Sequence, residues 1–311
     1  NTSKLVDHLL HDNRVRLVSF TGSTEVGRKL LKVASDQVLK TSMELGGNAP
    51  LIVFDDADME TAVDGCMVAK MRNLGEACTA ANRIYVHENV AEEFKDKFSQ
   101  RMGSLKVGNG LDKTVDVGPL VNAETRDKVA YFVNDAIKKG AELSVGGESI
   151  DGPGFYYPPT VLFNVPDSSE CLNDEIFGPV AAIQTFKDTE DVITRANNTE
   201  YGLVAYVFTE DMKKGMQVCE RLDYGMVGIQ TWIDNAVATQ ILISQQEIVK
   251  LNMEHCNANG ITIGVGVTAQ VEQAYTLGIV TTAEARNAAG CLLYTSPSPR
   301  DQRGARMPAW A

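Results

Sequence analysis

The chain has 311 residues, of which 44% are hydrophobic, and its formal net charge at pH 7 is −12. This length allows one large domain or two to three smaller ones, and the hydrophobic content is ample for a buried core. The acidity argues against a nucleic-acid partner and is typical of a soluble enzyme surface.

Strand and helix signals alternate over the first 230 residues, which predicts an α/β protein. In the first half we expect a strand over 14–20, a helix over 25–34 capped by Thr24, strands over 39–44 and 49–54, a helix from 55 to about 72 and a strand over 83–86. Further on we expect helices over 90–102, 123–139, 189–197 and 211–222, and strands over 160–163, 180–186 and 204–208.

The composition changes near Gln230, after which charged residues become sparse. Residues 240–289 could form helices and a Gly-rich strand. From Cys291 to Ala311 there is no periodicity, and three prolines disfavour regular structure. We therefore predict that 291–311 is disordered and artefact-like rather than evolved sequence.

The first candidate motif is the octapeptide FTGSTEVG, from Phe20 to Gly27. It places a Gly-Ser turn between a predicted strand and a predicted helix. Backbone N–H groups at the start of that helix, together with the Ser23 hydroxyl, can hold a phosphate. An ordinary helix cap is the alternative interpretation of this turn taken alone.

The second candidate is the pair Glu44 and Cys78, 34 residues apart. A thiol can attack a carbonyl, and a carboxylate can later activate water against the resulting thioester. Glu44 could instead be a structural acid in a turn, and Cys78 a buried small hydrophobe. The neighbours of Cys78 are small or polar, which favours a loop over an apolar face.

Two further segments flank this pair. Arg72 precedes Cys78 by six residues, and its guanidinium could hold a carboxylate in a bidentate manner. The alternative is a solvated arginine that ends a helix. The segment EIFGP, from Glu175 to Pro179, carries no meaning by itself.

Taken in order, five segments resemble the aldehyde dehydrogenase family: FTGSTEVG at 20–27, ELGGNAP at 44–50, GEACTAANR at 75–83, EIFGP at 175–179 and DYGMVG at 223–228. The resemblance implies an α/β fold, with an aldehyde dehydrogenase-like three-layer catalytic domain and a partial Rossmann-like nucleotide-binding domain. The implied division is 1–46 for the C-terminal part of the dinucleotide-binding domain, 47–230 for the catalytic domain, 231–290 for an unassigned segment and 291–311 for the tail.

The resemblance also implies roles for particular residues. Cys78 would be the nucleophile, Glu44 the general base that releases the acid, and NAD or NADP the cofactor. The implied cofactor contacts are Thr21, Gly22, Ser23, Val26, Leu45, Glu175 and Phe177. The segment around Arg72 is similar to the succinate-semialdehyde dehydrogenase branch, in which this arginine holds the distal carboxylate of the substrate. The family is homo-oligomeric, although its oligomerisation strand is not evident here.

This sequence departs from the family pattern at Glu76, because the family usually has Gly-Gln-x-Cys where this chain has Gly75-Glu76-Ala77-Cys78. The resemblance begins after the family's first βαβ units, so the family's oxyanion-hole asparagine is expected to be absent and the chain by itself to be inactive. Two other functions stay open, a non-catalytic remnant of this fold and a cysteine-dependent ester hydrolase without nicotinamide.

The six cysteines and four histidines are scattered and include no C-x-x-C pair. This spacing predicts neither a metal site nor a disulfide framework. It favours a reducing compartment, and we expect the cytoplasm, with the mitochondrial matrix as the alternative. No apolar run reaches membrane-spanning length, so we expect no membrane partner. The family resemblance implies a small-molecule aldehyde as the partner.

Overall fold

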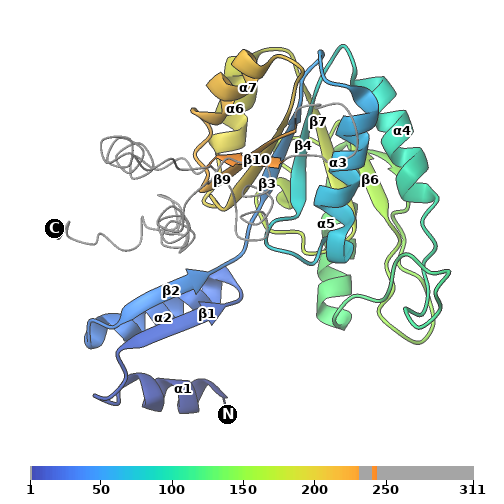
Figure 1. The fold of residues 1–311 in the computed structure, drawn as a ribbon. Helices are drawn as coiled ribbons and strands as arrows, with labels where there is room; N and C mark the ends of the chain where they lie inside the picture. The colour runs from blue at the N-terminus through green and yellow to red at the C-terminus, as the bar shows by residue number, and fades with distance from the viewer. Residues whose placement is uncertain (1, 231–239, 244–311) are drawn as a thin grey trace. The chain divides into compact units, whose positions relative to one another are not determined.

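The computed structural model describes residues 2–230 and 240–243. The chain forms two compact units, one that ends at Gly46 and one that begins at Gly47, and each is described by itself (Figure 1). The predictions for 244–290 and 291–311 lie outside the described residues.

The first unit is a βαβ arrangement. It consists of α1 (Thr2–Leu10), β1 (Leu17–Thr21), α2 (Thr24–Asp36) and β2 (Lys40–Glu44). The two strands pair in parallel, and α2 makes the crossover that parallel pairing requires. This is the arrangement expected of a partial Rossmann-like domain.

The start of α2 corrects one prediction. The cap is Ser23, whose side chain accepts a hydrogen bond from Val26 N at 3.3 Å, and Thr24 is already the first helical residue. Both residues are good N-caps, and only one of them can have extended backbone at the helix start. The helix α1 was not predicted, and Leu10 is its one buried residue.

The second unit is built on an eight-stranded sheet of order β10-β9-β8-β3-β4-β7-β6-β5. The strands are β3 (Ala49–Val53), β4 (Ala81–His87), β5 (Glu142–Val145), β6 (Thr160–Phe163), β7 (Val180–Phe186), β8 (Val204–Phe208), β9 (Met226–Gln230) and β10 (Gln240–Ile243). Neighbouring strands are parallel except at the two edges, where β5 and β10 run antiparallel. Strands β3, β6 and β8 are buried along their whole length, as expected for a sheet covered on both faces.

Helices cover both faces of this sheet and make three layers. Leu51 and Ile84 face a core shared with α3 (Met59–Met71) and α4 (Ala91–Gly103). The adjacent Ile52 and Tyr85 point to the opposite face, where α6 (Thr189–Asn197) and α7 (Met212–Cys219) pack. Helix α5 (Ala123–Lys139) covers that same opposite face over β6 and β7. The predicted three-layer α/β fold is confirmed.

The boundaries of several elements differ from the prediction. Helix α3 begins at Met59 rather than residue 55, because the Asp58 carboxylate caps it by accepting Thr61 N at 2.8 Å. Helix α7 ends at Cys219, three residues early. Strand β5 was missed, and its residues are mostly exposed. No helix in the described residues is long and apolar enough to span a membrane.

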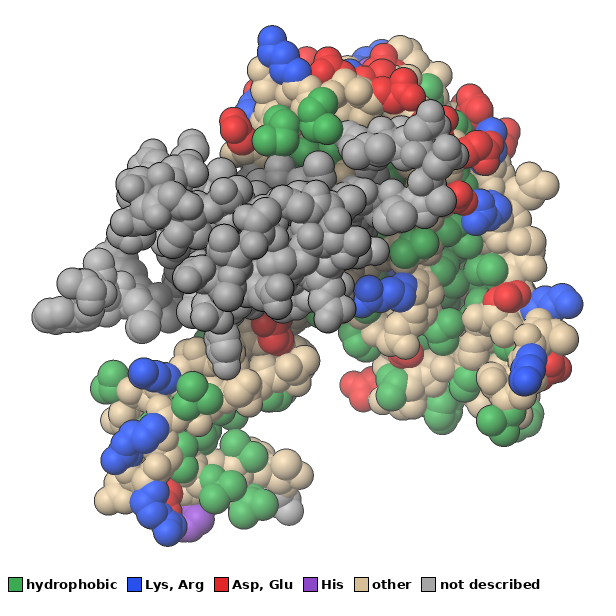
Figure 2. Space-filling view, in the orientation of Figure 1, with side chains coloured by type: hydrophobic (Ala, Val, Ile, Leu, Met, Phe, Trp, Pro, Cys, Tyr) green, Lys and Arg blue, Asp and Glu red, His purple; other side chains and the backbone are tan. Residues whose placement is uncertain are grey.

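Acidic side chains gather over α6 and α7 at the top of the second unit in Figure 2. The acidic residues that precede these two helices have local roles. Asp188 caps α6 through Glu190 N and Asp191 N, and Asp211 caps α7 through Lys214 N. Part of the net negative charge therefore reflects helix capping.

Candidate active site

The predicted phosphate-binding turn lies beside Glu44 in the first unit. Thr21 pairs with Glu44 in the β1–β2 register, and Gly22 N donates to Glu44 O at 3.0 Å. Thr21, Gly22, Ser23 and Val26 are all exposed. The turn thus presents its backbone and the start of the 13-residue helix α2 to solvent.

Leu45 follows β2 and packs against this helix. A Cβ placed on the buried Gly27 would lie 2.4 Å from Leu45 Cδ2, so α2 approaches the end of β2 only because residue 27 has no side chain. Glu44 is exposed at the end of β2, and Cys78 belongs to the second unit. The family resemblance implies that the two side chains converge on one cleft, and this stays a prediction.

A left-handed turn leads from α3 to Cys78. In the short 3₁₀ segment η1 (Arg72–Gly75), the φ angles of Asn73, Leu74 and Gly75 are +55°, +60° and +75°. Left-handed backbone costs a residue with a side chain roughly 1–2 kcal/mol, so Leu74 is strained. Strain of this kind is often retained where a loop must present a functional group.

Gly47 joins the cysteine segment to Glu175. A Cβ on Gly47 would lie 1.9 Å from Cys78 O, so the two backbones are in direct contact. Gly47 N donates to Oε1 of Glu175 at 3.0 Å. A Cβ on Gly75 would similarly lie 2.3 Å from Gly178 O. The structure therefore brings together segments that are far apart in the sequence, Gly47 and Glu175 being 128 residues apart, and Cys78 and Glu175 flank one glycine.

Glu175 and Phe177 have distinctive settings. Burial raises the pKa of Glu175, while its hydrogen bond from Gly47 and the charges of Lys128 and Lys70 oppose that rise. Lys128 Nζ also donates to Glu175 O at 3.1 Å. Phe177 has a positive φ of 54°, uncommon for an aromatic residue.

Sequence reasoning missed Tyr206. Its hydroxyl donates to Thr79 O at 2.8 Å, so strand β8 holds the carbonyl that follows Cys78. Burial raises the pKa of Tyr206 to about 12, the hydrogen bond to Thr79 and the Arg72 guanidinium oppose this rise, and the Cys78 thiol adds to it. Cys78 and the exposed Arg72 therefore lie within electrostatic reach of the same phenol. Nothing in the apolar run of β8 signals this role.

The family model described as aldehyde dehydrogenase family matches residues 1–242. The chain belongs to the aldehyde dehydrogenase family. It is 52% identical over 231 residues to a succinate-semialdehyde dehydrogenase of Paenarthrobacter nicotinovorans, covering 74% of this chain and 51% of that protein. It is 45% identical over 225 residues to an NADP(+) succinate-semialdehyde dehydrogenase of Escherichia coli K12, covering 72% and 47%.

A crystal structure of succinate-semialdehyde dehydrogenase from Burkholderia pseudomallei superposes with a TM-score of 0.73 at 41% identity, covering 79% of this chain and 51% of that one. The predicted family and fold are thus confirmed. The chain spans about half the length of the curated relatives that it matches.

The residues present fit the dinucleotide that this family implies. An exposed turn at a helix N-terminus suits a pyrophosphate, and the Glu175 carboxylate can accept hydrogen bonds from ribose hydroxyls. In the described residues, no group of three or more His, Cys, Asp or Glu side chains could hold a metal ion.

Glu76, which departs from the family pattern, has a hydrogen-bond partner of its own. Oε1 of Glu76 accepts a hydrogen bond from Val121 N at 3.1 Å, and Glu76 O accepts one from Asn73 Nδ2 at 2.8 Å. Glu76 therefore ties the cysteine segment to the residues just before α5.

Cys78 stands apart from the other cysteines in the described residues. Cys66, Cys171 and Cys219 are buried, whereas Cys78 is partly exposed. Burial raises the pKa of Cys66, and it raises the pKa of Cys171 and of Cys219 to about 12. Those three thiols are therefore poor nucleophiles near neutral pH.

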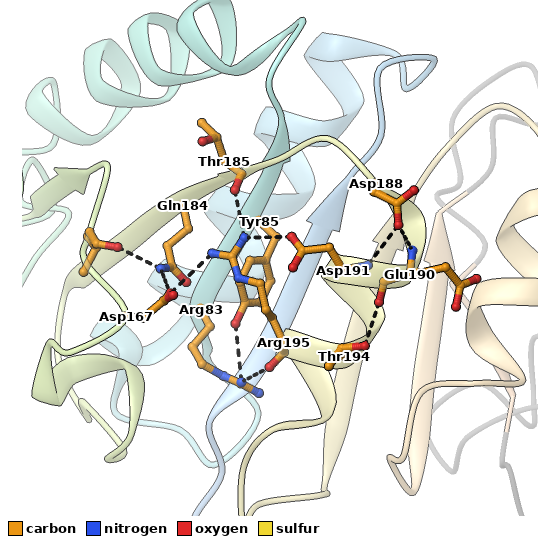
Figure 3. A network of polar contacts seen from close by, with 11 residues as sticks. Arg83, Tyr85, Asp167, Gln184, Thr185, Asp188, Glu190, Asp191, Thr194 and Arg195 are labelled. Atoms are coloured by element: carbon orange, nitrogen blue, oxygen red, sulfur yellow. Dashed lines mark hydrogen bonds and ion pairs between the residues drawn. The ribbon is translucent and has the colours of Figure 1, made fainter.

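A buried arginine anchors the strand that follows the cysteine segment. Arg83 is 2% exposed. Its Nε donates to Asn48 O at 3.0 Å, and its Nη2 donates to Ala196 O at 3.0 Å and Tyr224 Oη at 2.7 Å. Figure 3 shows Arg83 among the polar groups that join β4 and β7 to α6. This positive charge lies at the carboxyl end of α6, where the helix dipole favours it.

Proposed function

We propose that this chain carries the nucleophile and part of the cofactor site of an enzyme that oxidises an aldehyde to a carboxylic acid with NAD or NADP. The observation that supports it most is the partly exposed Cys78, whose backbone packs on the same Gly47 that holds Glu175. A thiol and a ribose-binding carboxylate so placed suit attack on an aldehyde beside a nicotinamide.

In the proposed reaction, Sγ of Cys78 bonds to the aldehyde carbon and gives a thiohemiacetal. NAD or NADP, when bound, would supply a hydride acceptor. Loss of a hydride from this carbon and of the hydroxyl proton to solvent would leave a thioester on Cys78. Glu44 takes a proton from water, and the water oxygen bonds to the thioester carbon as the C–S bond breaks. The carboxylic acid leaves and the Cys78 thiolate is restored.

We further propose that the cofactor lies along Thr21, Gly22, Ser23, Val26, Leu45, Glu175 and Phe177. The proposed substrate is an aldehyde with a distal carboxylate, as in succinate semialdehyde. The exposed Arg72 supports this choice of substrate. It acts on the same Tyr206 hydroxyl as Cys78, and its guanidinium can attract an anionic group. The two similar proteins from Paenarthrobacter nicotinovorans and Escherichia coli K12 are succinate-semialdehyde dehydrogenases, which supports the same substrate.

The first test concerns Cys78. In the 311-residue chain at pH 7.5, iodoacetamide should alkylate Cys78 before Cys66, Cys171 and Cys219, because among these four described cysteines Cys78 is partly exposed and the others are buried. Peptide mass spectrometry over a time course measures the order. Labelling of a buried cysteine first, with Cys78 inert, would contradict the proposal.

The second test concerns Arg72. In the same chain at low salt, Arg72→Ala should lower the rate at which anionic iodoacetate alkylates Cys78 by about threefold to tenfold, since a nearby guanidinium attracts the anion. The rate with neutral iodoacetamide should stay within about twofold of wild type on the same argument. Arg101→Ala, at an exposed ion pair with Asp64, is the matched control. Equal changes with both reagents would remove Arg72 from the substrate site.

A further inference from the structure

The least expected group in the second unit is Lys70, in the last turn of α3. Its side chain is 0% exposed. Lysine is almost never fully buried without a partner, since removing an ammonium group from water is costly. Its partner is Oδ1 of Asn82, also 0% exposed, to which Nζ donates at 2.9 Å.

Asn82 continues the contact toward the cysteine segment. Its Nδ2 donates to Gly47 O at 3.4 Å, a long bond. Gly47 N donates to Glu175, and the Gly47 Cα packs against Cys78 O. A buried series of polar contacts thus runs from Lys70 through Asn82 and Gly47 to Glu175, with the Cys78 backbone against its middle.

Lys70 also lies under the turn that leads to Cys78. Its Cε would be 3.2 Å from a Cβ placed on Gly75. The titratable groups that act on Lys70 are Cys66 on its own helix, Cys171 in η2 (Glu170–Leu172) and Glu175 in the following loop. Both thiols have raised pKa values and are neutral near pH 7, so Glu175 is the anion among them.

We propose that Lys70 is a positioning residue, whose ammonium group holds the Cys78 segment and the Glu175 carboxylate in one arrangement through Asn82 and Gly47. This inference rests on the proposed role of Cys78. An alkyl side chain would fill the same space without the cost of a buried charge, so packing alone does not account for a lysine here.

Lys70 changes its charge near neutral pH. Burial lowers its pKa to about 7, and the charge of Glu175 opposes that shift. Below about pH 7 the ammonium attracts the Glu175 carboxylate, and above it the amine keeps a hydrogen bond but loses this attraction. The reactivity of Cys78 should therefore respond to a proton on Lys70 as well as to its own ionisation.

The experiment measures the rate at which iodoacetamide alkylates Cys78 in the 311-residue chain between pH 6 and 9. The wild-type profile should contain a step near pH 7 in addition to thiolate formation. In Lys70→Met that step should be absent, with the rate at pH 6.5 lowered about fivefold. Lys97→Met removes a lysine that pairs with Glu60 on the surface, and its profile should match wild type.

Asn82→Asp supplies a second variant of nearly equal volume. A carboxylate beside Nζ favours the charged amine, so the step should move up by about one pH unit or more. Its amplitude should fall, because a carboxylate cannot replace the Nδ2 donor to Gly47 O. A purely structural role for Lys70 would not move the step. If Lys70→Met does not fold, Asn82→Asp still tests whether the charge of Lys70 affects Cys78.

The Glu175 carboxyl gives a readout that is independent of Cys78. Its ¹³C chemical shift should titrate at higher pH in Lys70→Met than in wild type, because a neighbouring positive charge is lost. Unchanged Cys78 profiles in both variants, or an unchanged Glu175 titration, overturn the inference. An inert Cys78 together with a shifted Glu175 titration would instead contradict the proposed function and leave the Lys70 network supported.

Discussion

Replacing Cys78 by alanine is expected to abolish aldehyde oxidation, and replacing Glu44 by glutamine to stop the reaction at the thioester. The host for both changes is the 52% identical Paenarthrobacter enzyme, with residues 1–230 of this chain in place of its matching segment. Loss of a catalytic nucleophile should lower kcat by at least about 10³-fold. Glu44→Gln keeps the size of the side chain but removes the base that activates water.

The two variants differ in their kinetics. With succinate semialdehyde, Glu44→Gln should give a rapid burst of reduced cofactor of about one equivalent per site, followed by slow turnover. Cys78→Ala should give no burst. Stopped-flow absorbance measures the burst, and intact-protein mass spectrometry detects the acyl group on Cys78.

Glu148→Gln, an exposed glutamate of the second unit, is the control and should keep the activity of the parent chimera. Residual oxidation by Cys78→Ala would remove this cysteine from the chemistry. A Glu44→Gln variant without a burst would show that Glu44 acts before the thioester forms.

Arg83→Met is expected to produce the largest loss of stability. The variant removes the Arg83 donor from Asn48 O in the interior and the bond to Tyr224. It also removes one of two donors from Ala196 O, which keeps the Tyr224 hydroxyl at 2.5 Å. Hydrogen bonds to a charged group contribute about 1.5–3 kcal/mol each and do not add fully. We expect the free energy of unfolding to fall by about 3–5 kcal/mol, in the range for breaking a buried charged network.

Urea unfolding followed by far-UV circular dichroism measures this loss. The matched control is Arg221→Met, which removes an arginine that pairs with Glu190 at the surface, and its unfolding midpoint should stay close to wild type. Equal midpoints for Arg83→Met and wild type would mean that the carbonyls find other donors and that Arg83 does not anchor the site.

Local sequence determined much of the fold. Helices α5 and α6 and strands β6, β7 and β8 begin and end where the pattern predicts. The reason is that their signals are local: caps at Asn122 and Asp188, and apolar runs in strands that are buried on both faces. The order of short motifs also identified the family, because each motif carries its residues at fixed spacing.

Local signals were weaker where two residues compete for one position. Ser23 and Thr24 are adjacent and both suit an N-cap, and the four residues before Met59 include three acids that could open α3. In the structure Asp58 caps the helix, whereas Asp56 accepts a hydrogen bond from Thr209 at 2.8 Å. That contact joins residues 153 apart, so it left no signal in the local pattern.

The tertiary structure alone decided how the candidate site is supported. From the sequence, Tyr206 is expected to be an ordinary residue of a buried strand. Lys70 is expected to be an ordinary charged residue near the end of a helix. Folding puts the Tyr206 hydroxyl on the carbonyl after Cys78, and it buries Lys70 against Asn82. The physical reason is that a polar group taken out of water must find a partner. For Tyr206 that partner is 127 residues away along the chain, so the packing of the sheet selects it.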